Sequence, residues 1–322
     1  MLKIKLPSYL MTDEQDIKNY HIENSVTTLT DAFSFTLSNN GGRNGGLVDD
    51  KDTVEIFDDG DPLMTGQIDT VDESTEIAVS GRDLMAWAVD TDAEPCPYLN
   101  ELPISHIQKL AKKVGLKFLV GKTPIPRLSP PLKFNIEVGE SYADAMVRLA
   151  AIAGVYLWLD RRGVLNIGLY DTAAAPLWHF RNSPDGSNCE IIHRVRSSKE
   201  VKSKMIAYGD IYTQKITVTD AKLKALGFSR PARVMNNWAE PADITKGRLE
   251  RAMNERRMRS RVWKVRYGGD HRMNGDIPEA GKTALVSSVY SGVSEQKTLI
   301  ASVRLSKGPG GTLTELELWD IE

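Results

Sequence analysis

The stretch from Asp52 to Asp90, DTVEIFDDGDPLMTGQIDTVDESTEIAVSGRDLMAWAVD, carries the pattern that decides the fold. Two runs of alternating apolar and polar residues flank the turn from Asp58 to Asp61, and this alternation is typical of half-buried strands joined in a hairpin. A third run, Ile77 to Ser80, extends the sheet, and Gly81-Arg82-Asp83 opens a short helix. The stretch therefore predicts the wall of an antiparallel β-structure and contains no recognisable active site.

Three further strand patterns precede this wall. Leu2 to Leu6 alternates apolar and charged residues, and Tyr20 to Val26 and Ala32 to Leu37 have the same period. The segment Asn39 to Gly46 is rich in glycine and asparagine, which leave few side chains to pack, and it predicts a flexible loop. We assign residues 1–91 to a first β domain.

The chain changes character between residues 92 and 171, which we assign to an inserted α+β module. Apolar residues from Ile104 to Val114 recur at helical spacing, and Gly115 follows at the C-cap position. After a proline-rich span, Pro124 to Pro131, a second helix is predicted to begin at Ser141 and to end at Gly154. A hairpin of two strands, at 155–160 and 164–170, completes the module.

Residues 172–322 return to strand patterns and form the third predicted domain. One long helix, 242–261, follows Pro241. The remaining runs favour strands, at 191–196, 201–208, 212–218, 263–267, 284–290, 298–305 and 312–319. The chain as a whole is therefore predicted to be α+β and mostly β, with two β domains, a small inserted module and a single long helix near the C-terminal β domain.

A weak internal repeat connects the two β domains. Val54 to Val79 and Leu285 to Leu318 share an outline of strand, turn, strand, turn and final strand. Antiparallel meanders resemble one another, so the periodicity alone leaves duplication and coincidence equally open.

The charge balance excludes a strong overall attraction to polyanions. Lys and Arg number 41 against 43 Asp and Glu, a formal net charge of -2, and hydrophobic residues make up 41% of the chain. No run approaches the roughly 18 apolar residues of a membrane helix. The start of the chain, MLKIKLPSYL, does not have the pattern of a signal peptide. We expect a protein made and assembled in the cytoplasm.

Motifs for catalysis, cofactors and metals are absent from the sequence. Cys96 and Cys189 lie far apart, which predicts two unpaired thiols, and the five histidines are scattered. The triplets Gly121-Lys122-Thr123 and Gly281-Lys282-Thr283 lack the spacing of a phosphate-binding loop and do not open helices. Clusters of aspartate, such as Asp58 to Asp61, lack the pattern of a calcium loop and predict solvated turns. We therefore expect no enzyme, and no catalytic, cofactor-binding or metal-binding residue.

The basic segment from 246 to 266 leaves two alternatives open. Its cations outnumber Glu250 and Glu255, and such density is able to track a phosphate backbone. No aromatic residue interrupts the helical part, however, and Leu249, Ala252 and Met253 form a narrow apolar stripe that predicts docking on the protein's own sheet. A face turned to solvent or to protein is favoured over a nucleic-acid interface.

The order of these elements resembles the baseplate hub proteins of contractile phage tails. That group includes Mu-like tail protein P and late control protein D, and it is related to the hub part of type VI secretion spike proteins. The matching segments, spread over most of the chain, are Phe33 to Leu37, Asp52 to Ile56, Thr65 to Asp69, Ser80 to Leu84, Val89-Asp90, Glu140 to Gly154, Arg251 to Arg261, Leu299 to Val303 and Thr312 to Leu318. The region 173–237 and the loop from Asn39 depart from the pattern, which leaves the start of the second barrel uncertain.

The resemblance implies a structural function. Two tail-tube-type antiparallel β-barrels lie in one chain, at 1–91 and 172–322, and three chains make a ring of pseudo-sixfold symmetry. Such a homotrimer is a symmetry adapter that joins the sixfold tail tube protein to the threefold central spike protein in the virion baseplate, beside other baseplate proteins and around a lumen for the passage of DNA. The alternatives are a nucleic-acid-binding protein acting through 246–266, and a spike-associated hydrolase, which needs a further domain.

Overall fold

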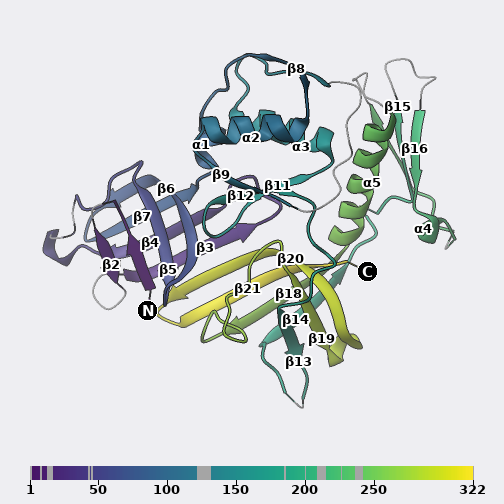
Figure 1. Cartoon of the computed structure of the whole chain (residues 1–322). Coiled ribbons are helices and arrows are strands. Elements are labelled where there is room, and N and C mark those ends of the chain that lie inside the picture. Colours follow the sequence, from purple (N-terminus) through teal and green to yellow (C-terminus); the bar gives the residue numbers. More distant parts are fainter. Residues whose placement is uncertain are drawn as a thin grey trace.

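The computed structural model of the chain describes residues 2–7, 9–12, 17–42, 44, 46–121, 132–184, 186–199, 201–208, 215–225, 227–235 and 242–321. The proline-rich span 124–131, Lys122, Thr123 and Pro241 lie outside the described residues. Figure 1 shows an N-terminal β half in purple and blue beside a C-terminal half whose strands run from teal through green to yellow, with a blue-to-teal module against them and helix α5 at one side. The structure is mostly β, as the sequence predicts.

Seven strands and one short helix form the N-terminal half: β1 (Leu2–Lys5), β2 (Leu10–Thr12), β3 (Ile17–Ser25), β4 (Ala32–Ser38), β5 (Thr53–Asp58), β6 (Asp61–Glu73), β7 (Glu76–Asp83) and α1 (Ala86–Asp90). They pair in the order β3-β4-β7-β6-β5-β1-β2, with every neighbouring pair antiparallel. The predicted period of two is confirmed in β7, where Ile77, Val79 and Gly81 are buried and the residues between them are not. The loop after β4 contains a 3-10 turn, η1 (Asn40–Gly42).

The C-terminal half repeats this plan. Its elements are β13 (Trp178–Asn182), β14 (Ile191–Arg196), β18 (Arg261–Gly268), β19 (Thr283–Ser288), η2 (Val289–Ser291), β20 (Val293–Gly308) and β21 (Gly311–Asp320). The strands pair in the order β13-β19-β20-β21-β18-β14, and only the β13–β19 pair is parallel. The edges β13 and β14 come close at the loop between them, where the Asn188 N–H donates to the Arg181 carbonyl at 3.1 Å.

One continuous sheet joins the two halves. The first part of β20 pairs with β19, and the second part, from Ser302 to Lys307, pairs with β3 of the N-terminal half. Both halves also share one hydrophobic core, which runs from Leu2 to Trp319 in sequence. The strand pairing therefore gives an open, shared sheet and does not record the closure of either half into the barrel that we expected, because β20 pairs beyond its own half.

The predicted repeat is confirmed at the level of strand pairing. In β5-β6-β7 the long strand β6 shifts register between Ile68 and Thr70, and in β19-β20-β21 the long strand β20 shifts between Ile300 and Ser302. Lys51, two residues before β5, has φ 77°, and Gly281, two residues before β19, has φ 86°. In both halves this turn exchanges two backbone hydrogen bonds with the residue before the register shift, at 2.8 to 3.0 Å.

The inserted module has its own core. Its elements are β8 (Pro97–Glu101), α2 (Pro103–Lys113), β9 (Lys117–Val120), β10 (Leu132–Asn135), α3 (Tyr142–Ala153), β11 (Tyr156–Leu159) and β12 (Val164–Gly168). Helix α3 has the predicted ends: the Ser141 hydroxyl accepts a hydrogen bond from the Asp144 N–H at 3.0 Å, and Gly154 has φ 69°. Met85 and Ala88 from the region of α1 pack in this core too. The boundaries at 91 and 171 stay predictions.

A smaller unit lies between β14 and β18. It consists of β15 (Lys204–Tyr208), β16 (Lys215–Thr219), α4 (Ala221–Ala225), β17 (Pro231–Met235) and α5 (Ala242–Arg259). The predicted stripe of Leu249, Ala252 and Met253 packs on this sheet, as expected. Helix α5 ends at Arg259, two residues earlier than predicted, because Val262 and the residues after it pair with β21. Among the described residues, no helix is long and apolar enough to cross a membrane.

Candidate assembly surfaces

The outer face of the shared sheet is polar and charged. On this face Lys264 lies opposite Glu317, and Glu315 lies opposite both Arg266 and Arg304. At the junction of the two halves Arg304 Nη2 is 2.9 Å from Glu23 Oε1. A shallow hollow of about 320 Å³ follows these rows over β14, β18, β21 and β20. A sheet face of this kind is built to stay in contact with water, whereas the opposite face forms the core.

Buried polar contacts also join the two halves. Arg272 reaches across the junction, with Nη1 3.0 Å from Asp58 Oδ2 and Nη2 3.0 Å from Asp61 Oδ2. His271 is 1% exposed; one ring nitrogen lies 2.6 Å from the Tyr20 hydroxyl and the other 2.7 Å from the Thr314 hydroxyl. Burial lowers the pKa of His271. The turn from Asp58 to Asp61, expected to be merely solvated, thus carries a structural ion pair that the sequence did not reveal.

Two buried carboxylates lie where β3, β4 and β7 meet α1. The Asp31 N–H donates to Asp83 Oδ2 at 3.0 Å, and the Asp31 carboxylate accepts from the Ser25 N–H at 2.8 Å and from the Thr28 hydroxyl at 3.0 Å. Burial, with the nearby Asp83, raises the pKa of Asp31 to about 8, and burial raises the pKa of Asp83 to about 7. Each carboxylate holds a turn together through backbone donors, and no pattern in the sequence marked the pair.

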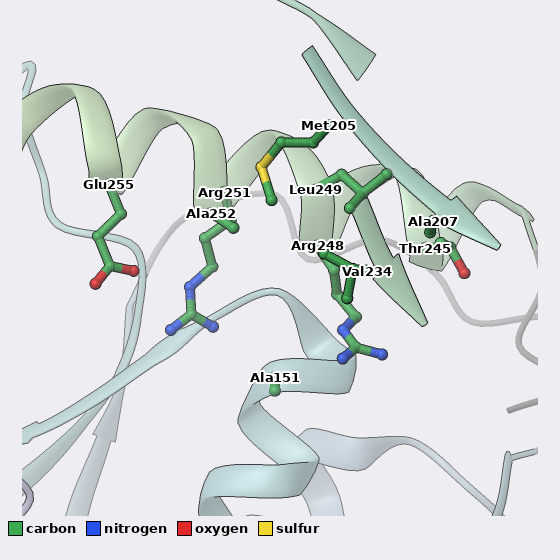
Figure 2. Close-up of a pocket in the computed structure, with 10 residues that line it drawn as sticks. All are labelled: Ala151, Met205, Ala207, Val234, Thr245, Arg248, Leu249, Arg251, Ala252 and Glu255. Carbon is green, nitrogen blue, oxygen red and sulfur yellow. The ribbon is translucent and has the colours of Figure 1, made fainter. Parts of the chain in front are cut away.

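Figure 2 shows a pocket between α5, α3 and the small sheet, with a volume of about 260 Å³. Arg251, on α5, is one of the residues that line it. The Arg251 guanidinium lies 3.8 Å from the centre of the Tyr156 ring and donates to the carbonyls of Val155 and Ala150, at the C-terminal end of α3. The C-terminal end of a helix carries partial negative charge, which favours a cation there. Arg251 therefore fastens α5 to the module.

Other cations of the basic segment also have partners within the chain. Arg259 is 2.5 Å from Glu255 and lies 5.2 Å from the centre of the Trp319 ring. Arg257 is 3.8 Å from Asp220, and Lys246 is 3.9 Å from Glu250. These contacts favour the protein-facing interpretation of the segment over the nucleic-acid interface, since intramolecular contacts occupy much of its positive charge.

The remaining sequence features form no chemical site in the described residues. No group of three or more His, Cys, Asp or Glu side chains in this part of the chain is able to hold a metal ion. Gly281 precedes strand β19 rather than a helix, in agreement with the rejection of a phosphate loop. Among the described residues Cys96 and Cys189 form no disulfide, and burial raises the pKa of Cys189 to about 12. His21 and His193 lie exposed on β3 and β14.

No protein-family model matches this chain, and no curated protein sequence does. Solved structures do resemble it. A tail protein from Neisseria meningitidis MC58 is 20% identical with a TM-score of 0.82, over 99% of this chain and 96% of that one. The 43 kDa tail protein of prophage MuSo2 from Shewanella oneidensis is 21% identical with a TM-score of 0.80, over 98% and 97%.

A third similar structure comes from type VI secretion. The E. coli protein c3393 is a component of that system with structural similarity to the T4 bacteriophage tail proteins gp27 and gp5. It is 12% identical to this chain with a TM-score of 0.60, over 99% of this chain and 77% of that one. The resemblance inferred from the order of the sequence elements is thus confirmed for the fold: this chain has the fold of prophage tail proteins, shared with a component of the type VI secretion system.

Proposed function

We propose that this chain is a structural hub of a contractile tail, in a phage or a phage-derived device. Three copies form a ring in which six half-units face the sixfold tail tube, while the threefold face receives the central spike. The protein makes or breaks no covalent bond in this function. It joins the sixfold tail tube to the threefold spike through its contact surfaces.

The observation that carries the proposal is the duplicated half. The β5-β6-β7 and β19-β20-β21 meanders share strand order, the position of the register shift and the turn that precedes them. A chain that carries two similar half-units presents six of them when three chains assemble. The similarity of the fold to prophage tail proteins supports the same proposal.

Each half is a tail-tube-type unit in this proposal, and curling of the sheet supports it in the C-terminal half. There the edge strands β13 and β14 approach each other at Arg181 and Asn188. The charged outer face of the shared sheet suits the wall of a water-filled lumen through which DNA passes, because its rows over β18, β21 and β20 set opposite charges side by side. The tail tube, the spike and other baseplate proteins are the proposed partners, and the virion is the proposed location.

Mass and shape in solution test the proposal. We expect light scattering to give about 107 kDa, three times the 35.7 kDa of one chain. Averaged electron micrographs of the isolated protein should show a three-lobed ring with a central channel. A mass of one chain at high protein concentration, with no ring in the images, would overturn the hub proposal.

A further inference from the structure

Besides β2 and β13, two strand edges of the shared sheet lack a strand partner on one side in the described part of the chain. One is the second part of β6, Thr70 to Glu73, which pairs with β7 on one side only. The other is β14, Ile191 to Arg196, which pairs with β18 on one side only. We call them the β6 edge and the β14 edge. Unpaired strand edges expose backbone donors and acceptors and readily accept another strand.

The repeat identifies the counterpart of each edge. Through their pairing across the register shifts, Thr70 on β6 corresponds to Ser302 on β20. On β3, His21 lies opposite Ser34 of β4, which lies opposite Ser80 of β7. On β14, His193 lies opposite Lys264 of β18, which lies opposite Glu317 of β21. Ser80 and Glu317 occupy corresponding places in the repeat, so His193 corresponds to His21. The counterparts of the two unpaired edges are therefore β20 and β3.

Those counterparts pair with each other inside the chain. Ser302 lies opposite Ser25 and Arg304 lies opposite Glu23, in an antiparallel ladder that extends to Lys307. The junction begins at the register shift, where the Val26 N–H donates to the Ala301 carbonyl at 2.9 Å. One copy of the junction is thus formed within the chain, and the second copy of the same surfaces, the β6 edge and the β14 edge, remains available.

The two edges are also complementary in charge. A groove beside the β6 edge, between this strand and the loop before β5, is lined by the acidic side chains of Asp49, Asp50 and Glu73, and by Asp69, which is already paired with Arg82. The β14 edge carries Arg196 and exposes the apolar residues Ile191 and Val195, which are 48% and 39% exposed, whereas Arg194 on the same strand is already held by Asp320, with Nη2 2.9 Å from Oδ2. Opposite charges on facing strands stabilise pairing and steer it, and exposed apolar residues gain from being covered.

We propose that the β14 edge of one copy of this chain pairs antiparallel with the β6 edge of a second copy, in the register of the β20–β3 junction. Transferred through the repeat, that register sets Thr70 opposite Ser197 of the second copy and Asp72 opposite its Val195. Glu73 then lies opposite Arg194. At the register shift, the Asp69 carbonyl then accepts a hydrogen bond from the Ser198 N–H of the second copy. This bond corresponds to the one that the Val26 N–H donates to the Ala301 carbonyl within the chain.

The contact is head-to-tail, since it uses two different surfaces of the same chain. Contacts of this type close into a ring or grow into a filament, depending on the rotation between copies. The inference deepens the proposed hub function, on which it rests for the closed ring, and it specifies which strands form the interface between protomers.

Disulfide trapping tests the register. We expect the double variant D72C/V195C to form chains of two and three copies under mild oxidation, visible on non-reducing gels and reversed by reductant, because directly opposed residues bring Cβ atoms within disulfide reach. The matched control is D72C/I191C, whose second cysteine lies on the same exposed face of β14 but four residues out of register, and which should stay uncrosslinked. The wild-type chain controls for Cys96 and Cys189.

The outcomes separate the two proposals. A trimer of the unoxidised variant by light scattering with no crosslink at this pair, or equal crosslinking of the control pair, would overturn the strand-edge interface and leave the hub intact. A monomer in light scattering with no crosslink would overturn both.

A charge exchange gives a second measurement without cysteines. We expect R196E to raise the concentration at which half of the chains are assembled on the order of tenfold, because it places like charges at the edge. The pair E73R/R196E should recover part of the loss, because this register sets residues 73 and 196 diagonally across the two strands on one face of the sheet. An assembly midpoint that R196E leaves unchanged would count against the β14 edge.

Discussion

The two halves of the sheet reach the same strand order with different side chains at the same place. In the N-terminal half Phe33 lies opposite Gly81, and in the C-terminal half Trp263 lies opposite Leu318. A Cβ atom on Gly81 would lie 2.4 Å from the Phe33 ring and 2.2 Å from the Gln67 carbonyl oxygen. In the N-terminal half the Phe33 ring therefore packs directly against the backbone of Gly81. The C-terminal half fills the same space with side chains. Strand pairing, rather than any particular core residue, is what the repeat preserves.

The halves also differ in what connects their corresponding strands. Between β3 and β4 the chain makes a short turn, residues 26–31, held by the buried Asp31. Between β14 and β18 the corresponding connection contains β15, β16, β17 and α5. A large insertion at this point is tolerated because it lies beside the sheet and contributes its own small core. The predictions below break or sharpen this comparison.

The largest effect is expected from adding a side chain at Gly81 in the N-terminal half. G81A should lower the free energy of unfolding by about 3 kcal/mol, because the new methyl group overlaps backbone that cannot move without breaking the β6–β7 ladder. Denaturant unfolding measures the change. The control is G308A, at the end of β20, where a Cβ atom meets nothing within 4 Å. Equal stabilities for the two variants would contradict the account of Phe33 packing.

The next effect concerns the ion pairs that join the halves. R272A should cost about 2 kcal/mol, since it removes the guanidinium that lies 3.0 Å from the carboxylate of Asp58, whose side chain is 16% exposed. R304A is the matched comparison at the same junction. The Arg304 side chain is 52% exposed, so its pair with Glu23 should contribute less than about 1 kcal/mol. A larger loss for R304A than for R272A in urea unfolding would reverse this ranking.

A pH dependence is expected from the buried Asp31 in the turn between β3 and β4. The folded pKa of Asp31, about 8, lies above the ordinary value of 3.8, so the unfolded chain releases this proton first as the pH rises. The stability that the protonated group contributes is complete below the ordinary value and is lost as the pH rises toward 8. D31N keeps the acceptor oxygen but does not titrate, and it should flatten the decline by on the order of 1.4 kcal/mol per pH unit between these two values.

Unfolding midpoints in urea across this pH range provide the measurement. The rival contribution comes from His271, whose lowered pKa acts in the opposite direction, with stability lost as the pH falls below its ordinary value of 6.5. A D31N profile parallel to that of the wild type would show that Asp31 titrates normally.

The smallest effect is expected at the insertion. R251M keeps the aliphatic stem but removes the cation from the Tyr156 ring and from the end of α3, and it should cost about 1 kcal/mol. K246A, at a pair whose side chains are 62% and 50% exposed, should change stability by less than about 0.5 kcal/mol. Thermal unfolding of the two variants compares them. A wild-type melting temperature for R251M would place the attachment of α5 elsewhere.

Local signals in the sequence predicted much of the fold. The alternation in β4 and β7, the Ser141 and Gly154 ends of α3 and the apolar stripe of α5 all depend on residues close together in the chain, and all are found in the structure. The strands β2, β8, β9, β10, β13 and β17 were not predicted. They are short, and β9 and β13 pair in parallel with distant strands, which gives no hairpin signal.

The candidate surfaces were less predictable. The acidic turn Asp58 to Asp61 and Arg272 are far apart in sequence, as are Tyr20 and His271, and only the closing of β20 on β3 brings them together. The carboxylates of Asp31 and Asp83 are equally invisible to a pattern search, because their burial comes from packing between four elements.

The sequence by itself determined the class of the protein, the period of its strands and the outline of its repeat, because hydrophobic alternation and turn residues act over a few positions. Tertiary structure alone decided that the two halves share one sheet, and which edges remain open. Strand pairing between the halves is made by backbone hydrogen bonds, whose donors and acceptors are the same in almost every residue, so it cannot be predicted from the pattern of side chains. The long strand β20 joins the two halves, because its first part pairs with β19 and its second part with β3.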